Sequence, residues 1–322
     1  FSLAAHWEEC EGVLHQYPAL RSVTRVRFLR GVSLLVSGMN GFARGHRGDI
    51  LNLKLDEYLW ASRDLLAAFE RAAQFLSDRC IFSVDQVPYN GQLVPLAVIL
   101  ARLSYEDGCL DKPATWDRIN QWYWSGVFGE LYGAHSPSIR AGSDVDQVTP
   151  WAKGETEVVP KTVQDAEFVE SRLITADEDS GVYRGLFSLL MARGARDWRT
   201  GKLFDGTTVA ELQPGFYQVF PPGFCRVHNV DPQLAASVLN RTPLGKRTES
   251  VMEGNDPKRY LSRLQSKAIM EDDEFDALLA THEIEPEYLL TSNWQAFFAD
   301  RHERFLGMIE YAMNKPAQRD RV

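Results

Sequence analysis

The chain has 322 residues, of which 44% are hydrophobic, and its formal net charge is −9 at pH 7. This length accommodates one large domain or two ordinary ones, and the hydrophobic content supports a packed core and argues against disorder. The negative charge is not that of a generic nucleic-acid coat protein, although it leaves room for a local basic face.

The cysteine pattern and the hydropathy narrow the class of protein further. The four cysteines lie far apart, at Cys10, Cys80, Cys109 and Cys225, and no Cys-x-x-Cys pair occurs. This spacing argues against a zinc ribbon and a disulfide framework, so we expect buried, reduced thiols in a cytoplasmic protein. No apolar run approaches the ~20 residues that span a bilayer and no signal peptide is visible, so no membrane partner is expected.

The amino-terminal half is predicted to be helical. Between Asp56 and Cys80, apolar residues recur at the spacing of one helix face, with Asp56 as the N-cap. Val94 to Leu103 is apolar almost all round, which predicts the buried central helix of a bundle. Arg118 to Tyr132 carries an aromatic stripe, which we expect in the core because aromatic area stabilises most when it is buried.

The rest of the chain alternates between irregular and helical patterns. Gly133 to Lys161 is rich in Ser, Gly, Pro and Asp, which predicts a long connection with a short helix near Ile139. Ser180 to Arg193 is again a compact apolar helix. Leu203 to Phe220 has the Gly and Pro breaks of short strands and turns, and the pattern is helical from Pro257 onward.

Two short segments carry the most specific pattern. They read Gly215-Phe216-Tyr217-Gln218-Val219-Phe220-Pro221 and Ser237-Val238-Leu239-Asn240-Arg241-Thr242-Pro243-Leu244. Together they resemble the His-Asn-His (HNH) hairpin of the GmrSD-like restriction endonuclease family. In that family a paired histidine precedes Ile-Phe-Pro, and Asn-Lys-Thr-Pro-Leu follows after a short helix. Here the positions of the paired histidine hold Tyr217 and Gln218.

The resemblance extends in family order over nearly the full chain. The other matching segments are Gly48–Leu53, Leu93–Ala97, Trp122–Gly133, Gly194–Gly201 and Asp256–Leu261. The family also has an amino-terminal nucleotide-binding domain with an Asp-Gly-Gln-Gln-Arg signature, a string that does not occur here. We therefore expect a carboxy-terminal portion of a longer protein, or a processed chain, with that nucleotide-binding domain or a partner subunit among its partners.

The residues at the HNH positions predict that catalysis is lost. An HNH site needs an imidazole that takes a proton from water, and a divalent ion that stabilises charge on the phosphate. Tyr217 titrates too high for this task, and Gln218 is not a base. Asn240 is expected to tie the loop together by hydrogen bonds. Glu249, in place of the family's later asparagine, could hold a metal, but one ligand does not make a site, so no cofactor is expected.

A run of cations after the hairpin is the candidate for nucleic-acid contact. It comprises Arg241, Lys246, Arg247, Lys258, Arg259, Arg263 and Lys267. Clustered Lys and Arg bind phosphates with an affinity that falls as salt rises. The alternative is a solvated face that balances the acidic stretch Glu271–Glu274, and the sequence leaves both interpretations open.

Four further motifs are weaker. The loop Arg44–Asp49 could cradle a phosphate, but it lacks the Lys-Ser/Thr of a P-loop, so an exposed loop is favoured. His228 lacks a second pair of ligands and is interpreted as a surface histidine. Arg140 either contacts DNA or caps a helix. Asp197 is expected to cap or turn the chain.

The sequence thus predicts a mainly α fold, in which a helical bundle (1–195) precedes a degenerate, ββα HNH-like element embedded in further helices (196–322). The resemblance implies a DNA-associated protein of bacterial defence that has lost HNH catalysis. One alternative is an active nuclease that binds Mg or Mn through Glu249, Asn240 and either Asp205 or Asp231. Another is a non-catalytic architectural or interaction module.

Overall fold

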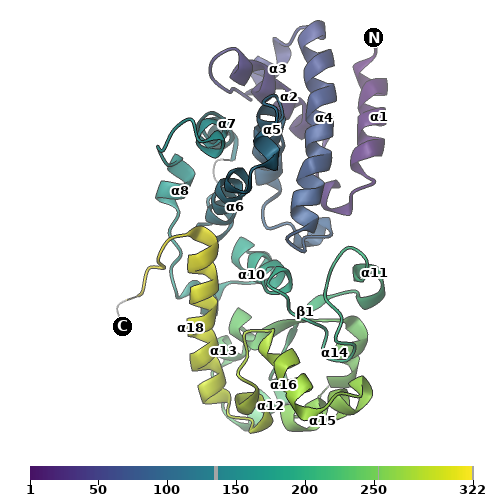
Figure 1. The fold of residues 1–322 in the computed structure, drawn as a ribbon, viewed down its shortest axis with the longest axis vertical. Coiled ribbons are helices and arrows are strands. Elements are labelled where there is room, and N and C mark those ends of the chain that lie inside the picture. The colour runs from purple at the N-terminus through teal and green to yellow at the C-terminus, as the bar shows by residue number, and fades with distance from the viewer. Residues whose placement is uncertain (134–136, 253, 321–322) are drawn as a thin grey trace. The chain divides into compact units, whose positions relative to one another are not determined.

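The computed structural model describes residues 1–133, 137–252 and 254–320, which are mainly helical with one small sheet (Figure 1). Contacts within the chain divide it into two compact units, each described by itself. Unit 1 comprises Phe1–Leu76, Ile81–Glu167 and Ala312–Pro316. Unit 2 comprises Ser77–Cys80, Phe168–Tyr311 and Ala317–Val322.

Unit 1 is a helical bundle, as the sequence predicted. Its helices are α1 (Leu3–Leu14), α2 (Arg25–Met39), α3 (Arg47–Leu51), α4 (Leu55–Ser77), α5 (Leu93–Leu103), α6 (Pro113–Phe128), α7 (Pro137–Lys153) and α8 (Lys161–Asp165). Helix α5 packs against both α2 and α7, and all of its residues except Arg102 are buried. The predicted buried central helix is therefore confirmed.

The predicted aromatic core and the predicted cap have different outcomes. Trp122, Tyr123, Phe128 and Tyr132 are all buried, so the aromatic stripe belongs to the core. The N-cap prediction for Asp56 is wrong, because α4 begins one residue earlier and Asp56 lies in its first turn. There its charge still complements the positive end of the helix dipole.

The long connection predicted for Gly133–Lys161 is largely a helix. Helix α7 buries Ala141, Val145, Val148 and Ala152, whose spacing of four, three and four residues marks one helix face. This apolar spacing is not evident in the sequence, because polar residues separate its members and because Pro150 lies inside the helix. One polar residue is itself buried, because Asp144 accepts hydrogen bonds from the hydroxyls of Tyr132 and Thr162.

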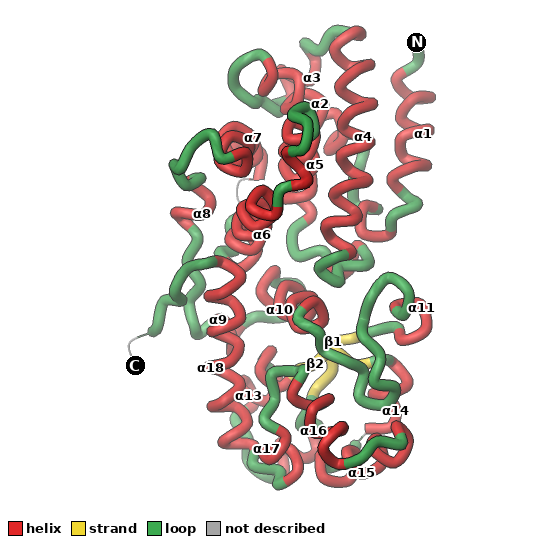
Figure 2. The backbone as a smooth tube through the Cα atoms, viewed as in Figure 1, coloured by secondary structure: helices red, strands yellow, loops and turns green. Residues whose placement is uncertain are grey.

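Unit 2 surrounds a two-stranded sheet with short helices. These are α9 (Arg172–Thr175), α10 (Gly181–Ala192), α11 (Val209–Leu212), α12 (Pro222–Val227), α13 (Pro232–Ala236), α14 (Lys246–Met252), α15 (Pro257–Ala268), α16 (Asp272–Ala280), α17 (Pro286–Leu290) and α18 (Trp294–Met313). Figure 2 shows the strands β1 (Gly215–Gln218) and β2 (Arg241–Leu244) in yellow among these helices. The strands are antiparallel, with Tyr217 opposite Thr242.

Helix α10 belongs with the hairpin. The ring of Phe216 in β1 stacks on Phe187 with 5.2 Å between ring centroids, and it meets the edge of Tyr183 at 5.0 Å. This aromatic cluster lies within unit 2, which begins in this part of the chain at Phe168, so the boundary expected at 195/196 falls inside unit 2.

A buried arginine of α18 fixes the second strand. One terminal nitrogen of Arg301 (Nη1) donates to the carbonyls of Leu239 and Arg241, at 2.8 and 2.6 Å. The other (Nη2) donates to the hydroxyl of Thr242 and to the carbonyl of His282, both at 3.2 Å. The guanidinium is wholly buried over the ring of Phe305, and burial lowers its pKa to about 9.

The hydrogen bonds around His282 define its tautomer. Because Arg301 can only donate, the Thr242 hydroxyl accepts from it and donates its own proton to Nδ1 of His282, 2.6 Å away. The opposite nitrogen, Nε2, donates to the carbonyl of Arg196 at 2.6 Å. The ring is therefore neutral, and burial lowers its pKa to about 3, helped by the nearby charge of Arg301.

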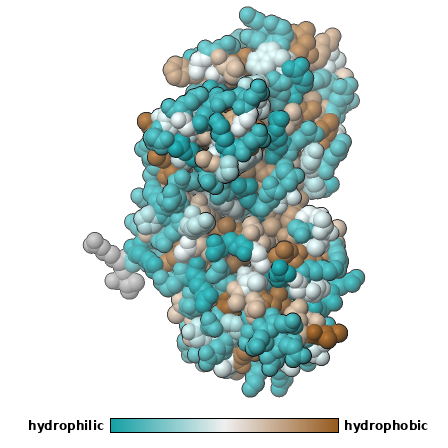
Figure 3. Space-filling model, viewed as in Figure 1, coloured by the Kyte–Doolittle hydropathy of each residue, from teal (hydrophilic) through white to brown (hydrophobic). Residues whose placement is uncertain are grey.

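All four cysteines are free and buried, as expected. On the face drawn in Figure 3, hydrophilic residues form most of the surface and apolar residues occur in small groups. Among the described residues, no helix is both long enough and apolar enough to cross a membrane.

We predict that His282 makes unit 2 sensitive to acid. Its folded pKa of about 3 lies below its ordinary 6.5, so the unfolded chain takes up the proton first. The stability that depends on the neutral ring is therefore complete above pH 6.5 and is lost as the pH falls toward 3. Below pH 6, urea unfolding should show up to about 1.4 kcal/mol lost per pH unit beyond the loss in His282→Gln.

The matched control for this measurement is His228→Gln, because His228 is exposed on the same unit. This variant should keep the pH dependence of the original chain. Parallel curves for the original chain and His282→Gln would contradict the assignment of a neutral, buried imidazole.

Candidate functional site

The side chain of Asn240 ties the loop between the two strands to itself. Its oxygen accepts from the amide of Phe220 at 2.8 Å, and its nitrogen donates to the carbonyls of Phe220 (2.9 Å) and Ala235 (2.8 Å). Asn240 has no exposed surface, so each of these bonds replaces one that water would otherwise make. The prediction that this asparagine holds the loop together is confirmed, and its amide is not free to bind a ligand.

Two further side chains hold the ends of the hairpin. Both oxygens of the buried Asp197 are used: Oδ2 accepts from the amide and hydroxyl of Thr200, and Oδ1 accepts from the amide of Gly245 at 2.9 Å. Asp197 therefore turns the chain, as expected, and also fixes the residue that joins β2 to α14. The hydroxyl of Tyr260 donates to the carbonyl of Val219 at 2.7 Å, just beyond β1.

A pocket of about 360 Å³ lies beside this hairpin. It is lined by Tyr217, Gln218, Pro221, Pro222, Arg241, Glu249, Met252 and Gly254. The structure thus brings together three of the four degenerate catalytic positions, from β1 and α14. The fourth, Asn240, is buried and takes no part in the lining.

The electrostatics of the pocket do not favour a general base. Burial raises the pKa of the Tyr217 phenol, and the negative charge of Glu249 raises it further. The phenol is therefore a hydrogen-bond donor at neutral pH. Gln218 donates to the carbonyl of Ala235 at 3.5 Å, which directs its amide nitrogen toward the loop. The pocket offers hydrogen bonds, not an imidazole that exchanges protons near pH 7.

The candidate metal ligands are engaged locally. Asp205 accepts from the amide and hydroxyl of Thr207 in a tight turn, and Asp231 caps α13 through the amides of its first turn. Within the described residues, no three His, Cys, Asp or Glu side chains are grouped as a metal site. His228 is exposed and stacks on Phe224, with 4.0 Å between ring centroids.

The cations of the basic run differ in whether they already form hydrogen bonds or ion pairs within the protein. Arg241 is 18% exposed, donates to the carbonyl of Phe216 and lies 3.5 Å from the carboxylate of Glu178. In contrast, the cations of α14 and α15 point into solvent. The exposed members are Lys246, Arg247, Lys258, Arg259, Arg263 and Lys267. In the part of the chain that the structure describes, none of these six has an acidic group within ion-pair distance.

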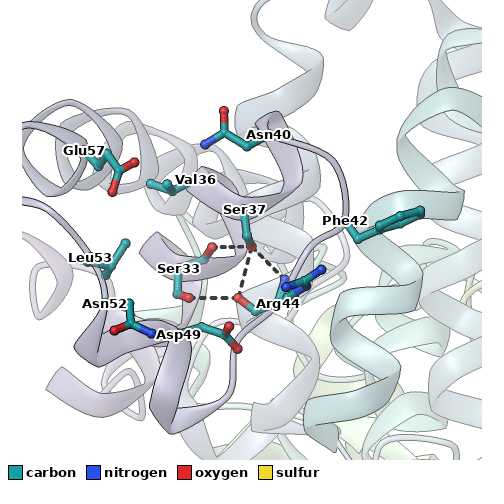
Figure 4. Close-up of a pocket in the computed structure, with 10 residues that line it drawn as sticks. All are labelled: Ser33, Val36, Ser37, Asn40, Phe42, Arg44, Asp49, Asn52, Leu53 and Glu57. Atoms are coloured by element: carbon teal, nitrogen blue, oxygen red, sulfur yellow. Dashed lines mark hydrogen bonds between the residues drawn. The ribbon is translucent and has the colours of Figure 1, made fainter.

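The loop Arg44–Asp49 of unit 1 is occupied by its own hydrogen bonds (Figure 4). Ser33 and Ser37 donate to the carbonyl of Arg44, and the amide of Arg44 donates back to the Ser37 hydroxyl at 2.7 Å. The amide of His46 donates to Asp49. These amides are therefore unavailable as a phosphate cradle, which agrees with the interpretation as an exposed loop.

Arg140 is also engaged within unit 1. Its guanidinium donates to the hydroxyl of Thr162 in α8 at 3.1 Å, and Thr162 in turn donates to the buried carboxylate of Asp144 at 2.6 Å. The positive charge of Arg140 thus lies near a buried negative group, and it partly offsets the rise that burial causes in the pKa of Asp144.

The sequence analysis missed His282 and Arg301 as organising residues. His282 has no sequence signal of this role, because its buried position follows from tertiary packing. Arg301 did have a sequence signal, because it stands between Phe297 and Phe305 at four-residue spacing, on the apolar face of α18. A charged residue on an otherwise apolar helix face predicts a buried, fully hydrogen-bonded group.

We expect Asn240→Ala to destabilise unit 2 by about 3 kcal/mol, since it leaves buried backbone groups of Phe220 and Ala235 without partners at about 1–3 kcal/mol each. The control is Gln233→Ala, an exposed substitution in the same loop, which should stay within about 0.5 kcal/mol of the original chain. Urea unfolding measures both. A decrease in the free energy of unfolding of less than about 1 kcal/mol for Asn240→Ala would show that the loop does not depend on the hydrogen bonds of this side chain.

Comparisons with known proteins identify one similar protein and no family. No family profile matches the chain. It is similar to the uncharacterized protein MJ0686 of Methanocaldococcus jannaschii, with 25% identity over 166 residues. The alignment covers 49% of this chain and 27% of the archaeal protein, so the chain spans about a quarter of its relative. The name of that relative carries no activity, and the resemblance to the GmrSD-like family stays a prediction.

Proposed function

We propose that the chain is a degenerate relative of GmrSD-like, modification-dependent restriction nucleases, and that it associates with DNA in bacterial defence without cutting it. The order of elements supports this proposal, since β1, a loop, β2 and then α14 follow one another as in a ββα element. The hydrogen bonds of the Asn240 side chain also support the proposal. They hold the loop in place, while the positions of the family's paired histidine carry Tyr217 and Gln218.

The single observation that carries the DNA association is the set of uncommitted cations on α14 and α15. Arg259, Arg263 and Lys267 follow one another at four-residue spacing, so they form one row along the exposed face of α15. Like charges at this spacing destabilise a helix by about 0.2–0.5 kcal/mol per pair. Within the described residues no acidic group forms an ion pair with this row, so the row is suited to an external polyanion such as the DNA backbone.

This arrangement also bears on the alternative of a solvated face that balances the acidic stretch Glu271–Glu274. Within that stretch, Asp272 accepts from Gln265 at 2.6 Å, and Glu274 accepts from the amide of Glu271 at 3.3 Å. The described acidic groups are thus used to order α16, and they form no ion pair with the basic run. The observations favour DNA contact over internal charge balance.

The proposal that the chain does not cut DNA rests on the side chains available to bind a metal ion. Catalysis by an altered ligand set would need Asn240 and either Asp205 or Asp231 to join Glu249 around an ion. The side-chain amide of Asn240 is hydrogen-bonded within the loop. The carboxylates of Asp205 and Asp231 accept hydrogen bonds from a local turn and a helix cap. An architectural module without DNA affinity is the remaining alternative, and it is distinguished by the binding measurement below.

We predict that the chain does not cleave DNA. Purified protein should leave both modified and unmodified duplexes intact in Mg²⁺, Mn²⁺ and Ni²⁺, because no imidazole lies at the hairpin to activate water. The assay is gel electrophoresis of a supercoiled plasmid, which reports single nicks. Metal-dependent nicking that disappears in Glu249→Ala would overturn this prediction and establish the altered-ligand nuclease.

The second prediction concerns the salt dependence of DNA binding. Each neutralised phosphate contributes about 0.9 to the slope of log affinity against log salt. Replacing Lys246 and Arg247 by alanine should therefore flatten the slope by about 1.8 and weaken binding to all sequences alike. Fluorescence anisotropy of a labelled duplex over a salt series measures the slope.

The control for the salt series is Lys54→Ala with Arg71→Ala, which makes the same change of charge at exposed positions of unit 1. This pair should leave the slope unchanged. If both double variants flatten the slope equally, the binding reflects overall charge, and if neither does so, the architectural alternative takes the lead.

A further inference from the structure

The pocket beside the hairpin has the size and lining of a site for a small planar ligand. Its volume of about 360 Å³ falls in the range of natural ligand pockets, which is roughly 300–1,000 Å³. Pro221, Pro222 and Met252 supply apolar walls. Tyr217, Gln218, Arg241 and Glu249 supply a few polar groups among them, which is the composition that fixes the orientation of a bound ligand.

Glycine at position 215 sets the place of the aromatic ring. A Cβ atom at Gly215 would lie 2.6 Å from both Cε2 and Cζ of Tyr217, closer than real Cβ atoms approach such neighbours. The hydroxyl end of the Tyr217 ring therefore lies against Gly215, two residues earlier on β1. Tyr217 also lines the pocket, where a planar group could stack on its ring.

The carboxylate of Glu249 is the uncommitted acceptor of the site. It is partly buried, and within the described residues no hydrogen bond or ion pair engages it. Its two oxygens can accept two parallel hydrogen bonds from adjacent N–H groups of one ligand. The hydroxyl of Tyr217 adds a donor to the lining of the same pocket.

We infer that this pocket binds an unstacked nucleobase, with guanine as the base that it fits best. Guanine presents N1–H and the N2 amino group side by side, so it can donate two hydrogen bonds to Glu249 while it stacks on Tyr217 and offers its O6 carbonyl to a donor. Thymine has one N–H donor between two carbonyls, and those carbonyls oppose the carboxylate. This inference rests on the proposed function, because it names the part of DNA that the site reads.

The test compares two short single strands, one of thymidines only and one with a single central guanine. Fluorescence anisotropy should show the guanine strand binding about 5- to 150-fold more tightly, which is the discrimination that a good bidentate pair gives between bases. In Glu249→Gln the ratio of the two affinities should fall to about one, because an amide offers one acceptor and one donor. Removing the negative charge also weakens the general repulsion of both strands, so the ratio of the two affinities, and not either affinity alone, is the readout.

The control is Glu287→Gln, which makes the same change of charge at an exposed position of α17 and should keep the ratio. Isothermal titration of the unaltered chain with dGMP and with dTMP gives a second measurement that depends on no variant. Binding of dGMP with no detectable binding of dTMP is the expected result.

The outcomes separate the pocket from the proposed function. Equal affinity for both strands, still weakened by Lys246→Ala with Arg247→Ala, would overturn the nucleobase pocket and leave DNA association standing. Binding of dGMP, but of neither strand, would support the pocket and overturn DNA association. Binding of neither nucleotide nor strand would overturn both.

Discussion

The hairpin of unit 2 depends on one buried guanidinium. Arg301 reaches from α18 to three places in the chain: the turn at Leu239, strand β2 and the segment after α16 at His282. A buried charge is tolerated only when its hydrogen bonds are made, and here both terminal nitrogens are fully used. Substituting Arg301 would leave several carbonyls without donors at once, so the position of β2, and with it the pocket, is decided by a residue some 60 positions away.

The scaffold around the pocket is held more firmly than the pocket itself. Asn240, Asp197 and His282 each satisfy backbone or hydroxyl groups in the interior of unit 2. By contrast, Glu249 has no hydrogen-bond or ion-pair partner within the described residues. Hydrogen-bonded anchors next to a pocket with an unused acceptor would suit a binding site on a rigid support.

The basic face and the pocket fit one mode of DNA contact. In the proposed function, the cations of α14 and α15 would attract phosphates without regard to sequence, whereas the pocket would read one base. Glu249 lies on the same helix as Lys246 and Arg247, so a strand held by these cations would pass close to the pocket mouth. The negative charge of Glu249 weakens general attraction there, which favours a ligand that satisfies the carboxylate directly.

The sequence by itself determined the helical class, the buried α5, the aromatic core and the role of Asn240, because these follow from local periodicity and from hydrogen bonds within one loop. It did not give α7, where polar residues masked a four-three-four apolar stripe. Only the tertiary structure showed that Arg241 is paired with Glu178, that Lys246 and Arg247 have no ion pair among the described residues, and that His282 is neutral. Those states depend on groups distant in the sequence, whose proximity and burial set hydrogen bonds and pKa values that no local pattern encodes.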